Sequence, residues 1–236
     1  MSKKTIAIVG AGPGLGLSIA KRFGREGFRV ALVSRNRAKL EPLVAELKDA
    51  GIEAAAFTAD VTNPGSIAKA FDEIKAKFGT VDVLEYSPIT IPADPAGFAA
   101  LDVKTMTPEF ASEMVSTMAI GAVAAVQQVL PDMLQQKEGV ILITMGASAK
   151  GFMPMVGGWG IAGSAARNYA RTLHAAVKDQ GVYVAAVPLG VQIQKGDAHG
   201  DPDILAEAYY GLYRERKQPE LFINHLPEGI MELDRG

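Results

Sequence analysis

The sequence contains no cysteine, only one tryptophan and only three histidines. Without cysteine the chain cannot form a disulfide, use a thiolate nucleophile or bind a metal through sulfur. The histidines, at positions 174, 199 and 225, are scattered and lack metal-ligand spacing, so we predict no metal site. Charge nearly cancels, with 24 Lys and Arg against 26 Asp and Glu and a net charge of −2. This balance gives no broad electrostatic attraction to nucleic acid or to an anionic membrane.

Long hydrophobic runs are also missing. The most apolar central stretch, residues 119–131, is too short to span a bilayer. The N-terminal "MSKKTIAIVG" has two lysines and an apolar run, but "GAGPGLG" breaks that run and no cleavage pattern follows. We therefore expect a cytoplasmic protein without membrane or nucleic-acid partners. The length of 236 residues and the hydrophobic share of 48% suit a single domain over residues 1–236.

Short apolar, β-branched runs alternate with helical patterns along the chain. Runs that are apolar on both faces are typical of a parallel sheet covered by helices. Their alternation with helices predicts an α/β fold: a Rossmann-like, doubly wound, seven-stranded parallel sheet with helices on both faces. The expected strands are residues 5–10, 29–34, 53–60, 81–86, 139–145, 182–188 and 220–225. The expected helices are roughly residues 14–26, 36–50, 64–78, 108–136, 158–179 and 202–217.

Two irregular stretches interrupt this alternation. Residues 87–110 are proline-rich and follow the fourth expected strand, and residues 189–203 follow the sixth. Ligands of open α/β sheets bind beyond the carboxyl ends of the strands. We therefore expect both stretches to form the walls and lid of a pocket.

A glycine-rich turn joins the first expected strand to the first expected helix. In "IAIVGAGPGLGLSIAKRF", Gly10, Gly14 and Gly16 lie where a tight turn and a close backbone approach are needed. The start of the following helix offers free N–H groups and a partial positive charge to a pyrophosphate. This arrangement predicts a dinucleotide site.

The end of the second expected strand predicts which dinucleotide binds. A carboxylate at position 34 would bind a ribose 2′-hydroxyl and repel a 2′-phosphate, but Ser34 stands there. Arg35 and Arg37 follow, and guanidinium groups suit a phosphate. We therefore predict NADP(H) rather than NAD(H).

The glycine spacing, together with "TADVTN" at 58–63, resembles the classical short-chain dehydrogenase/reductase family over nearly the whole chain. By this resemblance, Asp60 and Val61 flank the adenine. Tyr86, Ser87 and Pro88 occupy the first three positions of the family's Asn-Asn-Ala-Gly turn, and "VPLGV" at 187–191 matches the Pro-Gly turn beside the nicotinamide. The predicted cofactor-binding residues are Gly10, Gly14, Leu15, Gly16, Ser34, Arg35, Asn36, Asp60, Val61, Tyr86, Ser87, Pro88, Pro188, Gly190 and Val191.

The same resemblance implies a catalytic tetrad of Asn, Ser, Tyr and Lys. In the family the tyrosine is the general acid/base, the lysine lowers its pKa and binds the nicotinamide ribose, the serine positions the substrate oxygen, and the asparagine holds a relay water. The register assigns these four positions to Met118, Gly146, Trp159 and Gly163. By this resemblance, the chain lacks all four tetrad residues, although the four positions keep the family's spacing along the sequence.

No simple substitution replaces the lost acid. The indole N–H of Trp159 only donates a hydrogen bond and does not titrate, so Trp159 either fills the vacated space or contacts a ligand. A Tyr-x-x-x-Lys sequence occurs at 213–217, but on a charged helix beyond the sixth strand. Weak candidates for a proton donor are Tyr86, Ser148 and Lys150.

Three functions stay open from the sequence. The first is an NADP(H)-dependent oxidoreductase with non-standard catalysis on an unknown small molecule. The second is a catalytically silent NADP(H)-binding sensor, regulator or scaffold, and the third is a non-redox enzyme on the same fold. The helices at 108–136 and 158–179 are rich in Ala and Gly and lie where the resembled family pairs its subunits, so we expect a homodimer or homotetramer.

Overall fold

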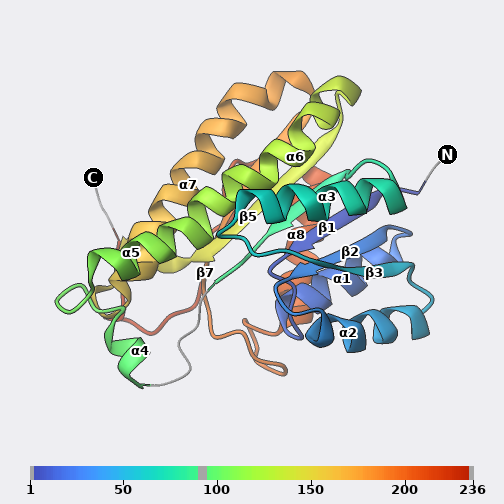
Figure 1. Ribbon diagram of the computed structural model, residues 1–236. Coiled ribbons are helices and arrows are strands. Elements are labelled where there is room, and N and C mark those ends of the chain that lie inside the picture. The colour runs from blue at the N-terminus through green and yellow to red at the C-terminus, as the bar shows by residue number, and fades with distance from the viewer. Residues whose placement is uncertain (1–2, 90–94, 234–236) are drawn as a thin grey trace.

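The computed structural model describes residues 3–89 and 95–233 (Figure 1). Its main sheet has seven parallel strands in the order β3-β2-β1-β4-β5-β7-β8. The predicted fold class is therefore confirmed. The strands are β1 (Thr5–Val9), β2 (Arg29–Ser34), β3 (Ala54–Thr58), β4 (Val83–Tyr86), β5 (Gly139–Gly146), β7 (Val182–Gly190) and β8 (Ile223–Asn224).

Helices cover both faces of this sheet (Figure 1). On one face lie α1 (Leu15–Arg25), α2 (Arg37–Asp49) and α8 (Pro202–Glu215), and on the other α3 (Pro64–Phe78), α6 (Gly121–Gln136) and α7 (Gly157–Val177). Local sequence sets several of their starts. Asn36 and Asn63 cap α2 and α3 with their side-chain oxygens, and Pro64 follows as the first residue of α3.

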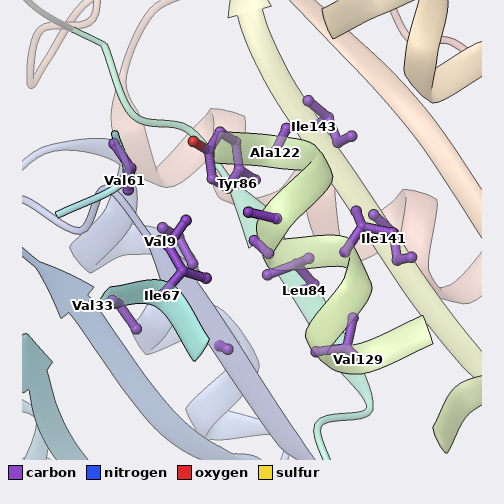
Figure 2. Close-up of a cluster of buried hydrophobic side chains, with 14 of the residues drawn as sticks. Val9, Val33, Val61, Ile67, Leu84, Tyr86, Ala122, Val129, Ile141 and Ile143 are labelled. Atoms are coloured by element: carbon purple, nitrogen blue, oxygen red, sulfur yellow. The ribbon is translucent and has the colours of Figure 1, made fainter. Parts of the chain in front are cut away.

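The sheet separates two apolar cores. One contains side chains from β1, β2 and β4 packed against α3, α6 and α7, including Val9, Val33 and Ile67 (Figure 2). The other lies between the opposite face and α1, α2 and α8, with Ile8 and Phe23 fully buried. Because both faces of the central strands are buried, those strands are apolar at nearly every position. This leaves the carboxyl edge of the sheet as the place for polar chemistry.

The helix expected at 108–136 is not continuous. It consists of α5 (Pro108–Val115), a π-helical turn at Ser116–Ile120, and α6. Together they form the one helical stretch of the described residues that is long and apolar enough to cross a membrane, although 56% of its most apolar window is buried in the fold. Isolated π-helical turns occur frequently at functional sites, and this one contains Met118.

The chain beyond β4 and β7 also differs from the predicted pattern. The strand expected at 220–225 is only two residues long as β8, and a separate antiparallel pair joins β6 (Gly151–Phe152) to β9 (Glu232–Leu233). The proline-rich stretch includes a short helix, α4 (Pro95–Ala99), while residues 90–94 lie outside the described residues. These elements have few residues each, too few for a hydrophobic period to predict them.

Candidate functional site

The glycine loop after β1 is fixed by its neighbours. Gly10 has a φ of +90°, a conformation that residues with a side chain rarely adopt. A Cβ atom at Gly10 would also lie 2.7 Å from the backbone nitrogen of Pro88. The amides of Gly10 and Ala11 both donate to the carbonyl of Val33, at 2.9 and 3.1 Å. Glycine at position 10 therefore holds the loop between the ends of β2 and β4.

The next part of the loop is open. A Cβ atom at Gly12 or Gly14 would meet no atom within 4 Å, and both residues line a cavity. Among the described residues, the amides of Leu15 and Gly16 donate no backbone hydrogen bond outside the helix, and the first turn of an α-helix leaves its amides without helical partners. These amides fit a pyrophosphate group, and a side chain at Gly12 would fill part of the cradle.

The end of β2 distinguishes the two predicted arginines. Arg37 pairs with Glu41 one helical turn away, with a distance of 2.9 Å between Nε and Oε1. Arg35 is exposed and forms no ion pair among residues 3–89 and 95–233. The side-chain oxygen of Asn36 caps α2 by accepting a hydrogen bond from the amide of Lys39. Arg35 is therefore the cation of this turn that is available to a phosphate, beside Ser34 at the strand end.

The end of β3 forms a separate tight turn. The carboxylate of Asp60 accepts hydrogen bonds from the hydroxyl and the amide of Thr62, at 2.7 and 2.9 Å. These bonds hold the pKa of Asp60 below its ordinary value, so the carboxylate is charged and already satisfied. Val61 is buried against the core on the α3 side. Neither residue lines the cavity at the carboxyl edge of the sheet, so their predicted place beside an adenine stays a prediction.

A cavity of about 360 Å³ opens at the carboxyl edge of the sheet. Its lining comes from the end of β5 and the residues that follow β4, from the glycine loop, and from the segments after β5 and β7. Apolar groups dominate its surface, as in most small-molecule sites. The lining residues are Gly10, Gly12, Gly14, Leu15, Gly16, Ser87, Pro88, Ile89, Met118, Thr144, Met145, Gly146, Ala147, Ser148, Met153, Val156, Trp159, Leu189, Gly190, Val191, Ile193 and Leu226.

Three of the four predicted tetrad positions meet in this cavity. Met118, Gly146 and Trp159 all line it, and Trp159 also packs against the core on the α7 side. Gly163 does not line the cavity, because α7 lies close to the turn after β5 at this point. A Cβ atom at Gly163 would lie 3.0 Å from the Cβ of Ala149. No side chain at these four positions carries a titratable proton.

The Tyr86 hydroxyl lies away from the cavity. Tyr86 is 1% exposed, and its hydroxyl donates to the carbonyl of Thr117 in the π-helical turn at 2.5 Å. A Cβ atom at Gly121 would lie 2.2 Å from this hydroxyl, so glycine there makes room for it. Figure 2 shows the ring beside Ala122 at the start of α6. Burial raises the pKa of Tyr86 far above its ordinary value, which makes Tyr86 a structural hydrogen-bond donor.

The other proton-donor candidates differ in whether they reach the cavity. Ser148 is buried and lines the cavity, and its hydroxyl takes part in no hydrogen bond among the residues that the structure describes. Lys150 is paired with Glu220, with 2.7 Å between Nζ and Oε1, outside the cavity. Tyr213 packs on Phe23 at the far end of α8. Ser148 is thus the candidate of this group that can touch a ligand.

The turn after β7 completes the cavity. Gly190 and Val191 line it as predicted, whereas Pro188 lies within β7 opposite Met145. A Cβ atom at Gly190 would lie 2.2 Å from the side-chain oxygen of Asn224, so the short strand β8 requires glycine there.

The sequence analysis missed one polar cluster beneath the cavity. Glu85 in β4 is fully buried and is hydrogen-bonded to the hydroxyls of Ser87 and Thr144. A signal was available: a glutamate interrupts an expected strand that is otherwise apolar on both faces. Such a residue must find buried partners or become neutral. Met153 and Val156, which also line the cavity, were missed because they lie in a short irregular segment, whereas Ile193 belongs to residues 189–203, which were expected to form a pocket wall.

Comparison with known protein families assigns this chain to a family. Residues 4–193 match the family described as short chain dehydrogenase, and the chain belongs to that family. The assignment confirms the resemblance on which the sequence analysis relied. It does not test the tetrad positions, which stay predictions.

Individual relatives are more distant. The chain is 26% identical over 223 residues to oxidoreductase asL5 of Sarocladium schorii, covering 93% of this chain and 85% of that one. It is 30% identical over 141 residues to a 3-oxoacyl-[acyl-carrier-protein] reductase of Staphylococcus epidermidis, covering 59% of this chain and 54% of the relative. Among solved structures, L-sorbose reductase of Gluconobacter frateurii, complexed with NADPH and L-sorbose, has a TM-score of 0.80 at 20% identity, covering 96% and 97% of the two chains. This last likeness concerns the fold.

Proposed function

We propose that the protein is an NADP(H)-binding oxidoreductase that acts on an apolar small molecule without the family's usual tetrad. One observation carries the proposal: the open glycine loop, the free amides at the start of α1 and an apolar cavity form one continuous site. NADPH, when bound, would supply a hydride. The chain's own part is to bind the phosphates, exclude water and orient the acceptor.

Arg35 supports the choice of NADP(H). It is exposed beside the glycine loop at the end of β2, and its neighbour Arg37 is already paired with Glu41. A guanidinium group can bind a phosphate through two parallel hydrogen bonds. The L-sorbose reductase with a similar fold was solved with NADPH, which is consistent with this choice.

The lack of a titratable group at Met118, Gly146, Trp159 and Gly163 supports non-standard catalysis. A ketone reduced without a nearby acid leaves an alkoxide almost unassisted, which is costly. Acceptors that need less help from a proton, such as iminium ions, quinones and activated alkenes, fit the cavity's chemistry better. Ser148 is placed to position the polar atom of such a molecule.

The same four positions also favour a second candidate, a silent NADP(H)-binding sensor or regulator. The two candidates differ in turnover and agree on binding. We would measure NADPH binding by its fluorescence, then NADPH oxidation with a panel of ketones, imines, quinones and activated alkenes. Oxidation with one class supports the enzyme, binding without any oxidation supports the sensor, and absence of NADPH binding contradicts both.

We also propose that the protein pairs with itself through the outer faces of α6 and α7. Ile161 on α7 is 48% exposed and Ile120 beside the start of α6 is 51% exposed. The many alanines and glycines of these helices let neighbouring helices approach closely. We expect light scattering at micromolar concentration to give the mass of a dimer or tetramer, and a monomeric mass would contradict the pairing.

A further inference from the structure

Glu85 is a buried acid in the centre of the sheet. It lies on β4 between Ile8 of β1 and Leu142 of β5, and it is 0% exposed. No ion pair of residues 3–89 and 95–233 includes it. A buried carboxyl without a cation normally costs several kcal/mol unless its oxygens are hydrogen-bonded or it is neutral. Its presence in this strand therefore calls for a role.

Two hydroxyl groups connect Glu85 to the cavity. The Thr144 hydroxyl on β5 lies 2.8 Å from Oε1, and the Ser87 hydroxyl lies 2.9 Å from Oε2. Both Thr144 and Ser87 line the cavity. On the opposite side, the Tyr209 hydroxyl of α8 lies 2.7 Å from the Thr144 hydroxyl. The four side chains form a chain of hydrogen bonds that begins in the core and ends at the ligand site.

The electrostatic surroundings favour a proton on Glu85 near neutral pH. Burial raises the pKa of the Glu85 carboxyl to about 7, although the bonds from Thr144 and Ser87 favour the carboxylate. The neighbours across the sheet, Ile8 and Leu142, are apolar, and the titratable group facing it from α8 is Tyr209. Burial and the charge on Glu85 raise the pKa of Tyr209 well above its ordinary value, so Tyr209 stays neutral.

Hydrogen counting shows what protonation changes. Each hydroxyl has one hydrogen, so an ionised Glu85 takes the hydrogens of both Thr144 and Ser87, and Tyr209 must donate to Thr144. A neutral Glu85 carries its own hydrogen and can donate to Thr144. The Thr144 hydrogen is then free to point at a ligand. The Ser87 hydroxyl can instead donate its hydrogen to the Val9 carbonyl at 3.5 Å. Thr144 is therefore the hydroxyl better placed to donate a proton to a ligand.

We propose that Glu85 and Thr144 form a buried proton relay, with Glu85 as the store and Thr144 as the group that hands the proton to the bound acceptor. The proposal rests on the proposed oxidoreductase function and narrows its substrate class to quinones and activated alkenes. Hydride addition leaves an enolate from an activated alkene and, from a quinone, an alkoxide that the neighbouring carbonyl group stabilises. Both oxyanions are weaker bases than the alkoxide from a simple ketone, so the reaction needs less proton transfer in its transition state.

The step balances in atoms and charge. The carbon of the acceptor gains a hydride from the reduced cofactor, and its oxygen gains the Thr144 proton. The Glu85 proton moves to Thr144, and Glu85 is left as a carboxylate that accepts from Thr144 and Ser87. A proton from water then restores Glu85 before the next cycle. Glu85 acts through Thr144, so it is a positioning residue, whereas Thr144 touches the ligand.

The first measurement needs no substrate. Carbon-13 NMR of glutamate carboxyl groups, with Glu85→Gln to assign the signal, should show a titration with a midpoint near pH 7. Bound NADPH should move this midpoint upward, because phosphates held at the glycine loop would add negative charge to the cavity that Ser87 also lines. A midpoint near 4.5, or one that NADPH does not shift, overturns the relay.

The second measurement follows the reaction. NADPH oxidation by 9,10-phenanthrenequinone should slow about tenfold per pH unit above the midpoint in the native protein. Glu85→Gln should lower the rate by ~10²–10⁴-fold and flatten the profile. Thr144→Val should do the same, while Thr144→Ser should keep most of the rate. NADPH fluorescence titrations show that each variant still folds and binds.

The outcomes distinguish a failure of the proton relay from a failure of the proposed NADP(H)-binding oxidoreductase function. If NADPH does not bind the native protein, the proposed function fails. If NADPH binds but neither the quinone nor an activated alkene is reduced, the relay fails and the binding function stands. If the quinone is reduced with the same pH profile in Glu85→Gln, the relay alone is overturned.

Discussion

The cavity has two halves that are built from different parts of the chain. The half after β1 is made of backbone: Gly10 fixes the turn, Gly12 leaves space, and Leu15 and Gly16 line the cavity at the start of α1. The half at the ends of β4 and β5 and the start of α7 is made of side chains. Its groups are mostly apolar, with hydroxyls only at a few points.

This difference explains how a binding site can persist while its chemistry changes. Backbone amides recognise a phosphate whatever the neighbouring side chains are, so the fold alone preserves the first half. The second half depends on individual side chains, and each replacement alters what it can do. Met118 and Trp159 add apolar surface there, while Glu85 and Thr144 add an acid in a new place.

The largest effect should come from rebuilding the second half. The combined change Met118→Asn, Gly146→Ser, Trp159→Tyr and Gly163→Lys should raise ketone reduction by ~10²–10⁴-fold, because it supplies a positioned acid. The measurement is NADPH oxidation with a simple aliphatic ketone. Brisk ketone reduction by the unaltered protein, unaffected by these changes, would contradict the predicted loss of the tetrad.

The geometry refines this variant. Gly146 has a φ of −76°, and a Cβ there would meet only the Ser148 hydroxyl at 3.7 Å, so serine fits. Gly163 is tighter, because its Cβ would lie 3.0 Å from that of Ala149. Adding Ala149→Gly should give the lysine room. The matched control is the same variant without Trp159→Tyr, which should fold but stay inactive toward ketones.

The next largest effect separates folding from binding in the first half. Gly10→Ala should destabilise the protein by roughly 2–4 kcal/mol, because it adds strain at positive φ and a clash with the Pro88 backbone. Gly12→Ala adds a methyl group to open space, so it should leave stability unchanged and weaken NADPH binding. Urea unfolding and NADPH fluorescence measure the two effects. Equal loss of stability in both variants would contradict this division.

Most of the fold could be predicted from the sequence because long periodic segments report it directly. The apolar runs of β1, β2 and β5 and the helix α3 lie where the pattern indicated. The π-helical turn at Ser116–Ile120 could not be predicted from hydrophobic periodicity, and in the structure its Thr117 carbonyl accepts a hydrogen bond from the Tyr86 hydroxyl. Such a contact joins residues far apart in the chain.

The site was predictable to a different degree in its two halves. The glycine loop has a local signature, so Gly10, Gly14 and Gly16 were predicted from their spacing between a strand and a helix, and all three line the cavity. The relay required knowing that β4 and β5 are neighbours, which brings Glu85 to Thr144. The orientation of Tyr86 into the core also followed from strand register and packing, and spacing along the chain cannot supply either.

A smaller effect tests the acid in the second half through stability. The folded protein keeps a proton on Glu85 up to about pH 7, whereas the unfolded chain releases it near its ordinary value of 4.5. Stability should therefore be highest below that value and fall by about 3 kcal/mol as the pH rises to 7. Glu85→Gln should remove this slope in urea unfolding. Parallel pH dependences in the two proteins would mean that Glu85 does not titrate as inferred.

The smallest effect concerns the cation beside the glycine loop. Arg35→Ala should weaken NADPH binding by roughly 1.5–3 kcal/mol and leave NADH binding nearly unchanged, because the lost contact is charge-assisted and specific to the 2′-phosphate. Arg37→Ala is the matched control: it removes the same charge from the same turn, but from a side chain already paired with Glu41. Calorimetric titration of both variants with both cofactors measures the difference. Equal affinities of the unaltered protein for NADPH and NADH would contradict the assignment of Arg35. If the two variants lost the same NADPH affinity, the turn would act through its overall charge, and phosphate recognition would not depend on one side chain.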